Sequence, residues 1–378
     1  MFRISSSGVL FDMIDSFPLR LSAYLCVLCG NNRLTQRTQR AAEDYQKLAW
    51  IDKINEHRIQ AAMPRPILAG IDIGGTKTAL GLSGLDAQLL SISRLPTQTE
   101  LGPHRIMQAA LDRLEQMALE IDARIAAIGV CCGGPLDRRK GLILSPPNLQ
   151  GWDEFPIINI VNERFAVPTL LDNDANAAAL GELHFGAGRG LQDLMYMTIS
   201  TGIGGGLIIR SEVVHGVADA AGEVGHMTVQ PDGPSCDCGS RGCLEVLCSG
   251  TAIARRARER LLIGNVHSLM KGKSITAKLV AEAAREGDIL AREVWDETVY
   301  YLSIGIGAVI SILAPEAVIL GGGVSLAGAQ LLEPLTEQVK SRSKLLPANK
   351  INILQAALAG DSGVYGTLFL AQRAAALS

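Results

Sequence analysis

The chain has 378 residues, of which 48% are hydrophobic and 19% are charged, and its formal net charge is −3. This composition is typical of an ordinary soluble globular protein, and the length suffices for roughly two domains. The slightly acidic balance argues against a nucleic-acid surface as the main function, because binding a phosphate backbone requires a basic stripe. We therefore expect no nucleic-acid partner.

The beginning of the chain carries no clear targeting signal. An apolar run at residues 22–29 is too short to span a bilayer, so we expect no membrane association. Asp12 and Asp15 precede this run without a recognisable cleavage pattern, which argues against a signal peptide. Thiols without an export signal indicate a reducing compartment, and we expect a cytoplasmic protein.

The first 62 residues differ in character from the rest. They are irregular apart from one amphipathic helix predicted over residues 40–58. Its apolar face is formed by Tyr45, Leu48, Ile51 and Ile54. Because the composition changes abruptly at Met63, we hypothesise that residues 1–62 are either a poorly ordered extension or the product of an upstream start codon, with Met63 as the natural start.

Strands and helices alternate after Pro66. Residues 67–82 are predicted to form a buried strand, a Gly-rich turn and a second strand. Helices are predicted at residues 104–122, 175–185 and 249–262, and strands at 124–132, 168–174, 193–201, 206–214, 316–325 (ending in a Gly turn) and 350–358. This alternation indicates α/β layers, with ligands at the short Gly turns that follow strands.

Three glycine clusters follow apolar strands, at Gly74–Gly75, Gly204–Gly206 and Gly321–Gly323. Bare backbone N–H groups at such turns can form anion-binding nests. The spacing matches neither the P-loop nor the dinucleotide fingerprint, and a single Gly turn could equally serve a hairpin. Three of them on strand ends predict a site for nucleotide phosphates.

The first cluster is flanked by polar side chains. Asp72 can hold the hydration shell of a Mg²⁺ ion between phosphates, although an Asp that caps the turn is the alternative. Lys77 can contact phosphate or can be a solvated surface lysine.

A candidate general base stands at Asn173–Asp174, between an apolar strand and a helix. A carboxylate at this position can instead be a helix N-cap, and the sequence alone leaves both readings open. Asn148 lies in a Pro-bounded loop, and Glu223 and Glu245 bracket a Cys-rich segment. Such donors and acceptors suit a polyhydroxylated ligand, and phosphoryl transfer to a hydroxyl needs little more than a carboxylate, metal and N–H groups for the phosphates, and rigid placement.

The Cys-rich segment predicts a structural zinc site. His226, Cys236, Cys238 and Cys243 fall within 18 positions, and glycines let the backbone turn sharply between them. A disulfide pair or inert small side chains are the alternatives, but the remaining cysteines are scattered. Four protein ligands leave no open metal position, which argues against a zinc-dependent hydrolase. His226 can place one ring nitrogen on zinc and the other toward a sugar hydroxyl, or it can be a purely structural ligand.

These segments together resemble the ROK family of sugar kinases and repressors. The resemblance runs from about Pro66 to the C-terminus and rests on DIGGTK, an Asn-Leu-x-Gly-Trp loop, DNDANAAALGE, STGIGGG, AAGEVGHMTV and CDCGSRGCLE, in that order. It implies an α/β protein with the actin-like ATPase (ribonuclease H-like) fold, in which two lobes enclose an active-site cleft. The lobes would be residues 63–174 plus 364–378, and residues 175–363 with the zinc-binding loop.

The resemblance also implies roles for individual residues. Asp174 would be the general base. The sugar contacts would be Gly134, Asn148, Asn173, Asp174, Glu223, His226 and Glu245. The ATP contacts would be Asp72, Gly74, Gly75, Thr76, Lys77, Thr201, Gly202, Gly204 and Gly205, with Gly321, Gly322 and Gly323 by the adenosine. The zinc ligands would be His226, Cys236, Cys238 and Cys243.

Two departures from the family pattern are visible. The family often has Pro-Gly where this chain has Gly133–Gly134, and often an aromatic residue where Leu247 stands. Neither change removes a reacting group. Like its relatives, the protein would form homodimers or homotetramers.

The expected activity is ATP-dependent phosphorylation of the 6-hydroxyl of a hexose, with glucose as the first candidate, ATP and Mg²⁺ as cofactors and Zn²⁺ in a structural role. A kinase for N-acetylmannosamine or N-acetylglucosamine is the alternative enzyme, because the same polar shell serves both. A sugar-responsive transcriptional repressor is the alternative of another class. It would need a DNA-reading domain, and residues 1–62 show no helix–turn–helix pair with a basic second helix.

Overall fold

A computed structural model describes residues 64–263 and 267–377. The description below concerns the compact unit that begins at Pro66, together with the two described residues before it. The helix expected at residues 40–58, the apolar run at 22–29 and the proposed extension 1–62 lie outside the described residues.

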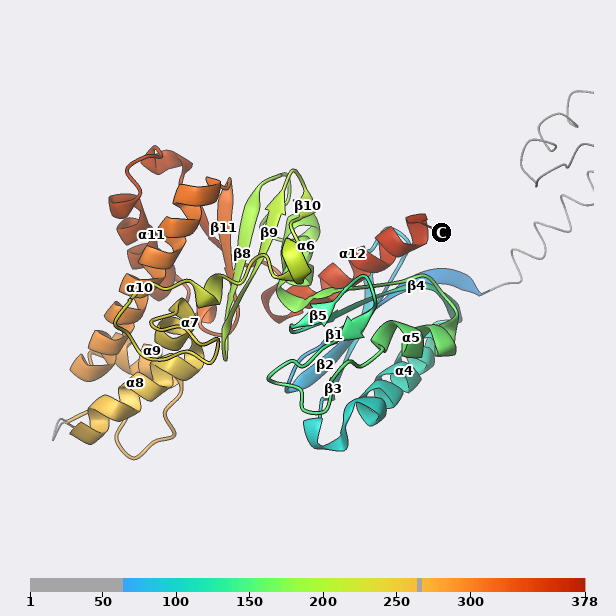
Figure 1. Cartoon of the computed structure of the whole chain (residues 1–378), viewed down its shortest axis with the longest axis horizontal. Coiled ribbons are helices and arrows are strands. Elements are labelled where there is room, and N and C mark those ends of the chain that lie inside the picture. The colour runs from blue at the N-terminus through green and yellow to red at the C-terminus, as the bar shows by residue number, and fades with distance from the viewer. Residues whose placement is uncertain (1–63, 264–266, 378) are drawn as a thin grey trace, which may run out of the picture. The chain divides into compact units, whose positions relative to one another are not determined.

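The first five-stranded sheet has the order β3-β2-β1-β4-β7. Its strands are β1 (Arg65–Ile73), β2 (Lys77–Ser83), β3 (Leu89–Pro96), β4 (Ala123–Cys132) and β7 (Thr169–Asn173). Strands β1, β2 and β3 form an antiparallel meander, and β4 pairs with β7 in parallel. Helices α4 (Pro103–Glu120) and α5 (Ile157–Phe165) pack on one face through a shared apolar core, as Figure 1 shows. The short hairpin β5 (Leu136–Asp137) and β6 (Leu142–Ile143) lies between β4 and α5 in the chain.

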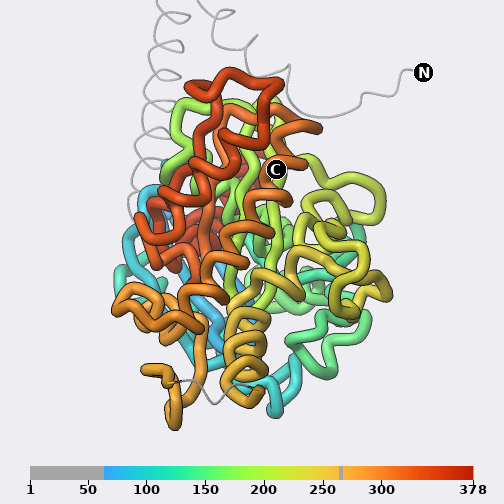
Figure 2. The backbone as a smooth tube through the Cα atoms, turned by 90° about the vertical axis from the view of Figure 1, so that its left-hand side faces the viewer, coloured from blue at the N-terminus to red at the C-terminus, as the bar shows by residue number. Residues whose placement is uncertain are grey.

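The second five-stranded sheet has the order β10-β9-β8-β11-β12. Its strands are β8 (Leu194–Ile199), β9 (Ile203–Ile209), β10 (Glu212–Val213), β11 (Ala317–Gly321) and β12 (Ile353–Gln355). The helices on one face are α7 (Leu244–Cys248), α8 (Gly250–Ile263), α9 (Ala277–Arg285), α10 (Ile289–Leu313) and α11 (Ala329–Arg342). Figure 2 shows these yellow to orange helices in front of the strands. Both faces of β8 and β11 are covered, which explains their continuous apolar sequences.

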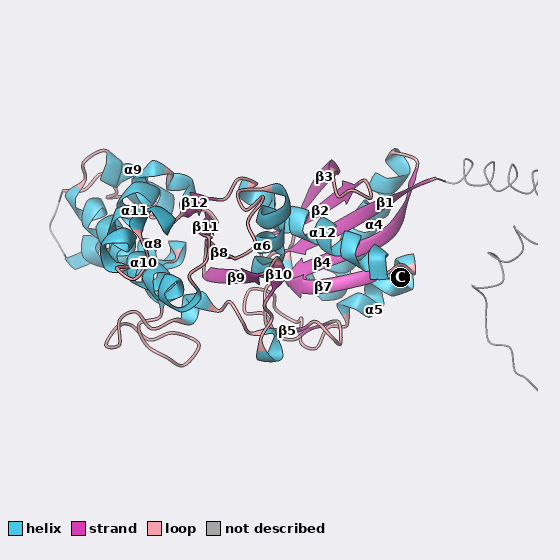
Figure 3. Ribbon diagram, turned by 90° about the horizontal axis from the view of Figure 1, so that it is seen from above, coloured by secondary structure: helices cyan, strands magenta, loops and turns pink. Residues whose placement is uncertain are grey.

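Two helices lie between the sheets. Helix α12 (Ser362–Leu377) packs its alanines and leucines on the first sheet, and α6 (Asp174–Phe185) packs on the second. The two helices also contact each other closely, because a Cβ on Gly181 or Gly366 would overlap a backbone carbonyl of the other helix. Figure 3 shows both between the two groups of strands. Helix α6 is therefore buried almost all round, and its N-terminus is firmly placed.

The expected elements are present in the described part of the chain, with two corrections. The single strand expected at residues 206–214 is two antiparallel strands, β9 and β10, because the chain turns at Arg210 and Ser211, which both have positive φ. Residues 204–206 were expected in a turn, but they belong to strand β9, and the turn is Ser200–Gly202. The glycines in β9 instead permit close packing. A Cβ on Gly206 would lie 2.5 Å from the Ala175 carbonyl oxygen, and a Cβ on Gly205 would lie 2.7 Å from that of Gly222.

Among the described helices, α10 alone has the length and hydropathy of a membrane span. It packs against α7, α8, α9 and α11, and Val294, Leu302 and Ile306 are fully buried. This helix is thus accounted for as the central helix of the layer beside the second sheet.

Candidate active site

The N-terminus of α6 shows which of the two residues Asn173 and Asp174 caps the helix. The N-cap is Asn173, whose side-chain oxygen accepts hydrogen bonds from the N–H groups of Ala175 (2.8 Å) and Asn176 (3.4 Å). The alternative in which Asp174 caps the helix is therefore wrong. Because Asn173 satisfies the orphan N–H groups, the carboxylate of Asp174 is not committed to capping.

Asp174 occupies the first turn of α6 and remains accessible to solvent. One carboxylate oxygen, Oδ1, accepts the Ala175 N–H at 2.8 Å. The other, Oδ2, lies 3.7 Å from where a Cβ on Gly133 would stand. Although the residue reaches solvent, the protein around it displaces water and raises the pKa of Asp174, while backbone N–H groups lower it. A carboxylate with a raised pKa is a better proton acceptor.

Asp72 is the penultimate residue of strand β1. Burial, and secondly the Asp174 carboxylate, raise the pKa of Asp72 to about 6. The Cys131 thiol donates a hydrogen bond to Asp72 Oδ1 at 3.3 Å, and burial raises the pKa of Cys131, so the thiol keeps its proton. Gly363, at the start of α12, leaves room for the carboxylate, since a Cβ there would lie 2.6 Å from Oδ2.

The turn between β1 and β2 presents backbone at the surface. Gly75, Thr76 and Lys77 are exposed, and the Gly74 N–H donates to the Lys77 carbonyl at 3.0 Å. Thr97 fixes the turn because its hydroxyl donates to the Gly74 carbonyl at 2.6 Å. The Lys77 ammonium lowers the pKa of Asp72, which burial raises. The alternatives of a capping Asp72 and an isolated surface lysine are thus less suited to the geometry.

Asn148 and Gly134 lie beside these elements. A Cβ on Gly75 would stand 3.1 Å from Asn148 Cβ, which places the Asn148 loop next to the Gly-rich turn. A Cβ on Gly134 would stand 3.5 Å from Asn173 Nδ2. The Asn173 amide group, whose oxygen caps α6, therefore presents its N–H donors toward Gly134.

The second Gly-rich turn is tied to Glu245. The Ile203 N–H donates to Glu245 Oε2 at 2.7 Å, and a Cβ on Gly202 would collide with that oxygen at 2.4 Å. The Gly250 N–H donates to the Ser200 carbonyl at 2.7 Å, and the Thr251 hydroxyl donates to that of Thr201 at 2.8 Å. The turn that was predicted to hold phosphate is thereby joined to a predicted sugar ligand.

Glu223 links the carboxylates of the site. Its pKa is raised, chiefly by burial and further by the charges of Asp174 and Glu245, while His226 lowers it. The charges of Asp174 and Glu245 both act on the Glu223 carboxyl group. Their separate origins in α6, a loop and α7 make this a tertiary arrangement.

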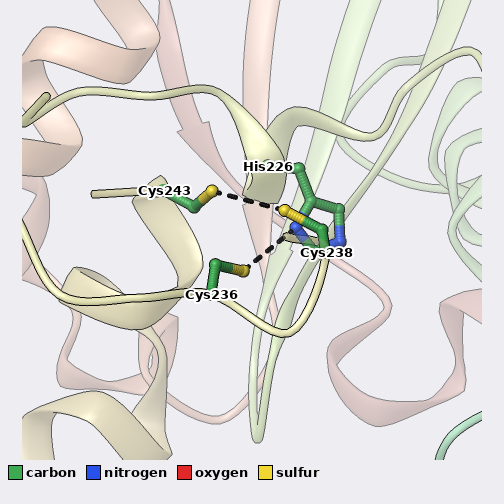
Figure 4. Close-up of side chains that lie close together, drawn as sticks. All are labelled: His226, Cys236, Cys238 and Cys243. Atoms are coloured by element: carbon green, nitrogen blue, oxygen red, sulfur yellow. Dashed lines mark hydrogen bonds between the residues drawn. The ribbon is translucent and has the colours of Figure 1, made fainter. Parts of the chain in front are cut away.

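The Cys/His cluster, made of His226, Cys236, Cys238 and Cys243, has the geometry of a metal site. One ligand atom from each residue lies within 4.8 Å of the others (Figure 4). The Cys238 and Cys243 sulfurs are 3.7 Å apart, which excludes a disulfide between them. This spacing matches the edge of about 3.8 Å expected for a tetrahedron with Zn–S bonds of about 2.3 Å. The donor set therefore fits zinc.

His226 faces both the cluster and the carboxylates. Its Nδ1 lies 3.6 Å from Cys236 Sγ, and its Nε2 lies 3.9 Å from Glu223 Oε2. A metal on the Nδ1 side would fix the tautomer and leave Nε2 toward Glu223. The geometry is thus compatible with a double role for this imidazole.

The backbone connects the cluster directly to Glu245. Cys243 precedes α7, and Glu245 is the second residue of that helix. The Val229 N–H donates to the Gly242 carbonyl at 2.9 Å, and the Leu244 N–H to that of Met227 at 2.9 Å. Only glycine fits at 242, because a Cβ would lie 1.6 Å from the Gln230 carbonyl oxygen and φ is +60°. Ordering this loop therefore orders Glu245.

A pocket of ≈ 290 Å³ lies beside the third Gly cluster. It is formed by α9, Trp295 and the segment from Gly323 to Ala327. Gly321 and Gly322 pack instead against β8, since Cβ atoms there would overlap Tyr196 and the Ile199 carbonyl. Of the three glycines, Gly323 is the one that lines the pocket.

Several residues at the site were not found from the sequence. The wall formed by α9 was missed because its residues read as an ordinary amphipathic helix. Asp172, two residues before Asp174 in the chain, and His215 were also missed, although their side chains meet at 2.8 Å. For Asp172, the available signal was a second acidic residue two positions before Asp174. For His215, the surrounding sequence carried no signal.

Comparison with known proteins places these features in a family. The model of the ROK family matches residues 68–374. A glucokinase from Thermotoga maritima is 35% identical over 312 residues, covering 80% of this chain and 96% of the relative. A ROK hexokinase from Thermus thermophilus is 34% identical with a TM-score of 0.73, covering 82% of this chain and 100% of that structure.

A third relative was solved with ligands. The ROK glucokinase from Streptomyces griseus, in complex with glucose and AMPPNP, is 33% identical with a TM-score of 0.69, over 81% of this chain and 99% of that one. These likenesses confirm the expected actin-like ATPase fold with two α/β lobes. The chain belongs to the ROK family.

Proposed function

We propose that this protein is an ATP-dependent sugar kinase that phosphorylates the 6-hydroxyl of a hexose, with glucose as the preferred substrate. The observation that carries the proposal is the N-terminus of α6, where Asn173 caps the helix and Asp174 Oδ2 faces the glycine at Gly133. The likeness to glucokinases over nearly their whole length supports the activity and the sugar.

Asp174 acts as the general base. Its free oxygen accepts the proton of the sugar hydroxyl as the hydroxyl oxygen bonds to the terminal phosphorus, and the bond from that phosphorus to the bridging oxygen of ADP breaks. Little covalent chemistry is required of the protein in such a transfer, so placement and charge stabilisation dominate. The raised pKa of Asp174 favours its role as proton acceptor.

The sugar is held by the groups gathered around Asp174. Glu223 and Glu245 accept hydrogen bonds from hydroxyls, while the Asn173 amide N–H groups and the backbone at Gly134 supply donors. His226 Nε2 and Asn148 complete the shell. Because Asp174 and Glu245 already disfavour the ionised form of Glu223, a neutral ligand with many hydroxyls suits this site better than an anion.

ATP binds across the three Gly-rich segments. The turns Gly74–Lys77 and Thr201–Gly202, with Gly204 and Gly205 behind the second, direct backbone N–H groups and the Lys77 ammonium to the phosphates. Asp72 would hold Mg²⁺ through its hydration shell, and the ion would neutralise charge on the phosphates. The adenine of ATP would enter the ≈ 290 Å³ pocket at Gly323, with Gly321 and Gly322 shaping the turn.

The Cys/His cluster binds a structural zinc ion. His226, Cys236, Cys238 and Cys243 would hold it, and four protein ligands would leave no position for a catalytic water. The ion would stabilise the loop that carries Glu223 and Glu245, so it supports sugar binding without taking part in the reaction.

Lobe boundaries, assembly and location complete the proposal. The lobes are residues 63–174 with 364–378, and residues 175–363, so that α6 and α12 run between them. The protein acts in the cytoplasm as a homodimer or homotetramer. Light scattering of the purified protein tests the assembly.

A coupled assay of ADP release across hexoses and N-acetylhexosamines tests the activity. Glucose is expected to give the highest kcat/KM, with product phosphorylated at O6 by NMR. A preference for N-acetylmannosamine would replace glucose as substrate. Absence of turnover on every sugar, together with sugar-releasable binding to upstream DNA, would favour the repressor alternative.

A further inference from the structure

Asp172 lies two residues before the proposed base and is almost completely buried, with 5% of its side chain exposed. Its Oδ1 accepts hydrogen bonds from the Asn173 N–H at 2.8 Å and from Asn176 Nδ2 at 2.9 Å. Asn173 is the residue that caps α6. The Asp172 carboxylate therefore fixes the backbone turn from which Asp174 projects.

The remaining oxygen of Asp172 reaches a residue from a distant part of the chain. His215, which follows β10, places its Nε2 2.8 Å from Asp172 Oδ2. A carboxylate can only accept, so Nε2 donates. The ring is 23% exposed, so the contact is largely shielded from water, where a hydrogen bond to a charged group is strong.

The segment His215–Ala221 has a second tie to the first half of the chain. The Arg138 N–H donates to Asp219 Oδ2 at 3.1 Å, and Arg138 Nε lies 3.6 Å from Asp219 Oδ1. Arg138 follows strand β5, next to Gly133–Gly134 in the chain. The contacts of His215 with Asp172 and of Asp219 with Arg138 thus hold the segment against the residue before the N-cap of α6 and against the end of β5.

The segment is also conformationally constrained. The Ala221 N–H donates to the His215 carbonyl at 3.0 Å, which closes it into a compact loop. Ala218 and Asp219 both have φ of 55°, an unfavourable region for residues with a Cβ. Such strain persists only when surrounding contacts over-determine the conformation. The loop leads within two residues into Glu223.

We propose that the pair His215–Asp172 is a positioning device that sets the sugar ligand Glu223 relative to the base Asp174. Asp172 orients the start of α6, and His215 begins the loop that ends before Glu223. The pair makes one rigid connection between the group that takes the proton and the group that holds the sugar. This inference rests on the proposed kinase activity. His215 touches no reacting atom and is a positioning residue.

The test compares His215→Ala with His215→Gln. The Gln amide nitrogen lies near the position of Nε2 and can still donate to Asp172, whereas Ala cannot. We expect His215→Ala to lower kcat/KM for the sugar by about 10- to 100-fold, the cost of misplacing groups by about 1 Å. KM for ATP should stay within about twofold of the parent. His215→Gln should recover a large part of the loss.

A matched control is Arg373→Ala. It removes the exposed Arg373–Glu212 pair, 3.0 Å long, which also joins α12 to β10 but lies outside the network around Asp174. This variant should keep kcat/KM within about twofold of the parent. Equal activity of His215→Ala and the parent, or equal losses in His215→Gln and His215→Ala, would overturn the proposal.

Hydrogen exchange tests the positioning role of the pair independently of the proposed kinase activity. If the parent protein phosphorylates no sugar, the proposed function fails, yet the pair still predicts faster exchange at residues 214–222 in His215→Ala than in His215→Gln. Equal exchange in the two variants would refute the pair. If His215→Ala does not fold, His215→Asn serves in its place, because its amide is too short to reach Asp172.

Discussion

The sugar side and the nucleotide side of the proposed site are built in different ways. The sugar side, comprising Asp174, Glu223, His226, Glu245 and the Cys/His cluster, is assembled from a few short segments, each ordered by its own hydrogen bonds or ligand spacing. The nucleotide side combines backbone turns with a pocket whose walls come from α9, α10 and the segment after β11. The first depends on a few side chains, and the second on the shape that several elements enclose. Substitutions should therefore have larger and more specific effects on the sugar side.

The largest effect is expected for Asp174→Asn. Asparagine keeps the shape but cannot accept the proton, so kcat should fall by roughly 10²–10⁴ or more while KM for the sugar changes little. Steady-state kinetics and sugar titration of the variant measure both quantities. The control is Asp112→Asn, whose partner is the exposed Arg164. Turnover of Asp174→Asn within tenfold of the parent would remove Asp174 from the mechanism.

The next largest effect is expected for Cys238→Ser, which removes one ligand of the Cys/His cluster. The bound metal should be lost, the thermal midpoint should fall by roughly 5–10 °C, and KM for the sugar should rise about 10- to 100-fold. Stability and sugar binding fall together because the same loop carries Glu223 and leads to Glu245. Elemental analysis, thermal unfolding and kinetics measure the three.

Cys248→Ser is the control for that experiment. Cys248 is buried, whereas Cys238 is exposed, and the Cys248 thiol donates to the Thr298 carbonyl at 3.6 Å, outside the cluster. This variant should retain its metal and its sugar affinity. Active parent protein that contains no stoichiometric zinc would contradict the structural role of the ion.

The sequence was sufficient where function depends on local spacing. The four ligands of the Cys/His cluster lie within 18 positions, so their convergence could be inferred without the fold. The N-cap could not be assigned, because Asn173 and Asp174 both have capping side chains and only the hydrogen bonds to Ala175 and Asn176 distinguish them.

The sequence was insufficient where function depends on tertiary packing. Gly204–Gly206 read as a turn, yet they are strand residues whose missing side chains admit α6 and the segment before Glu223. The contact between His215 and Asp172 joins positions 43 apart, with no periodic pattern to signal it. The pocket proposed for adenine is enclosed by separate elements, and no sequence motif encodes it.

A smaller effect, confined to the nucleotide side, is expected for Gly323→Val. A Cβ at this position meets no atom within 4 Å, so the new side chain can enter the pocket without displacing the backbone. KM for ATP should rise about tenfold, which is about 1.4 kcal/mol, while KM for the sugar stays within about twofold. The control is Leu345→Ala, a change at an exposed side chain away from the pocket. Equal changes in the two KM values would contradict the assignment of this pocket to the nucleotide.

The smallest effect concerns Asp72, whose pKa is raised by burial and by the charge of Asp174 on the sugar side, and lowered by Lys77 on the nucleotide side. Its pKa is about 6 in the folded protein and 3.8 as the unperturbed value, so folding favours the protonated acid. The ionised form therefore costs stability above pH 6, and this cost disappears as the pH falls from 6 to 4. Asp72→Asn removes the buried charge.

We expect Asp72→Asn to raise the free energy of unfolding by on the order of 1–3 kcal/mol at pH 8 and by much less at pH 4.5, although catalysis is impaired. Chemical denaturation of the ligand-free protein at both pH values measures this difference, and the low-pH pair serves as the internal control. A variant less stable than the parent at pH 8 would mean that the Asp72 carboxylate stabilises the fold. The presence of aspartate at this position would then be explained by its contribution to stability, without its proposed role in holding Mg²⁺ at the ATP phosphates.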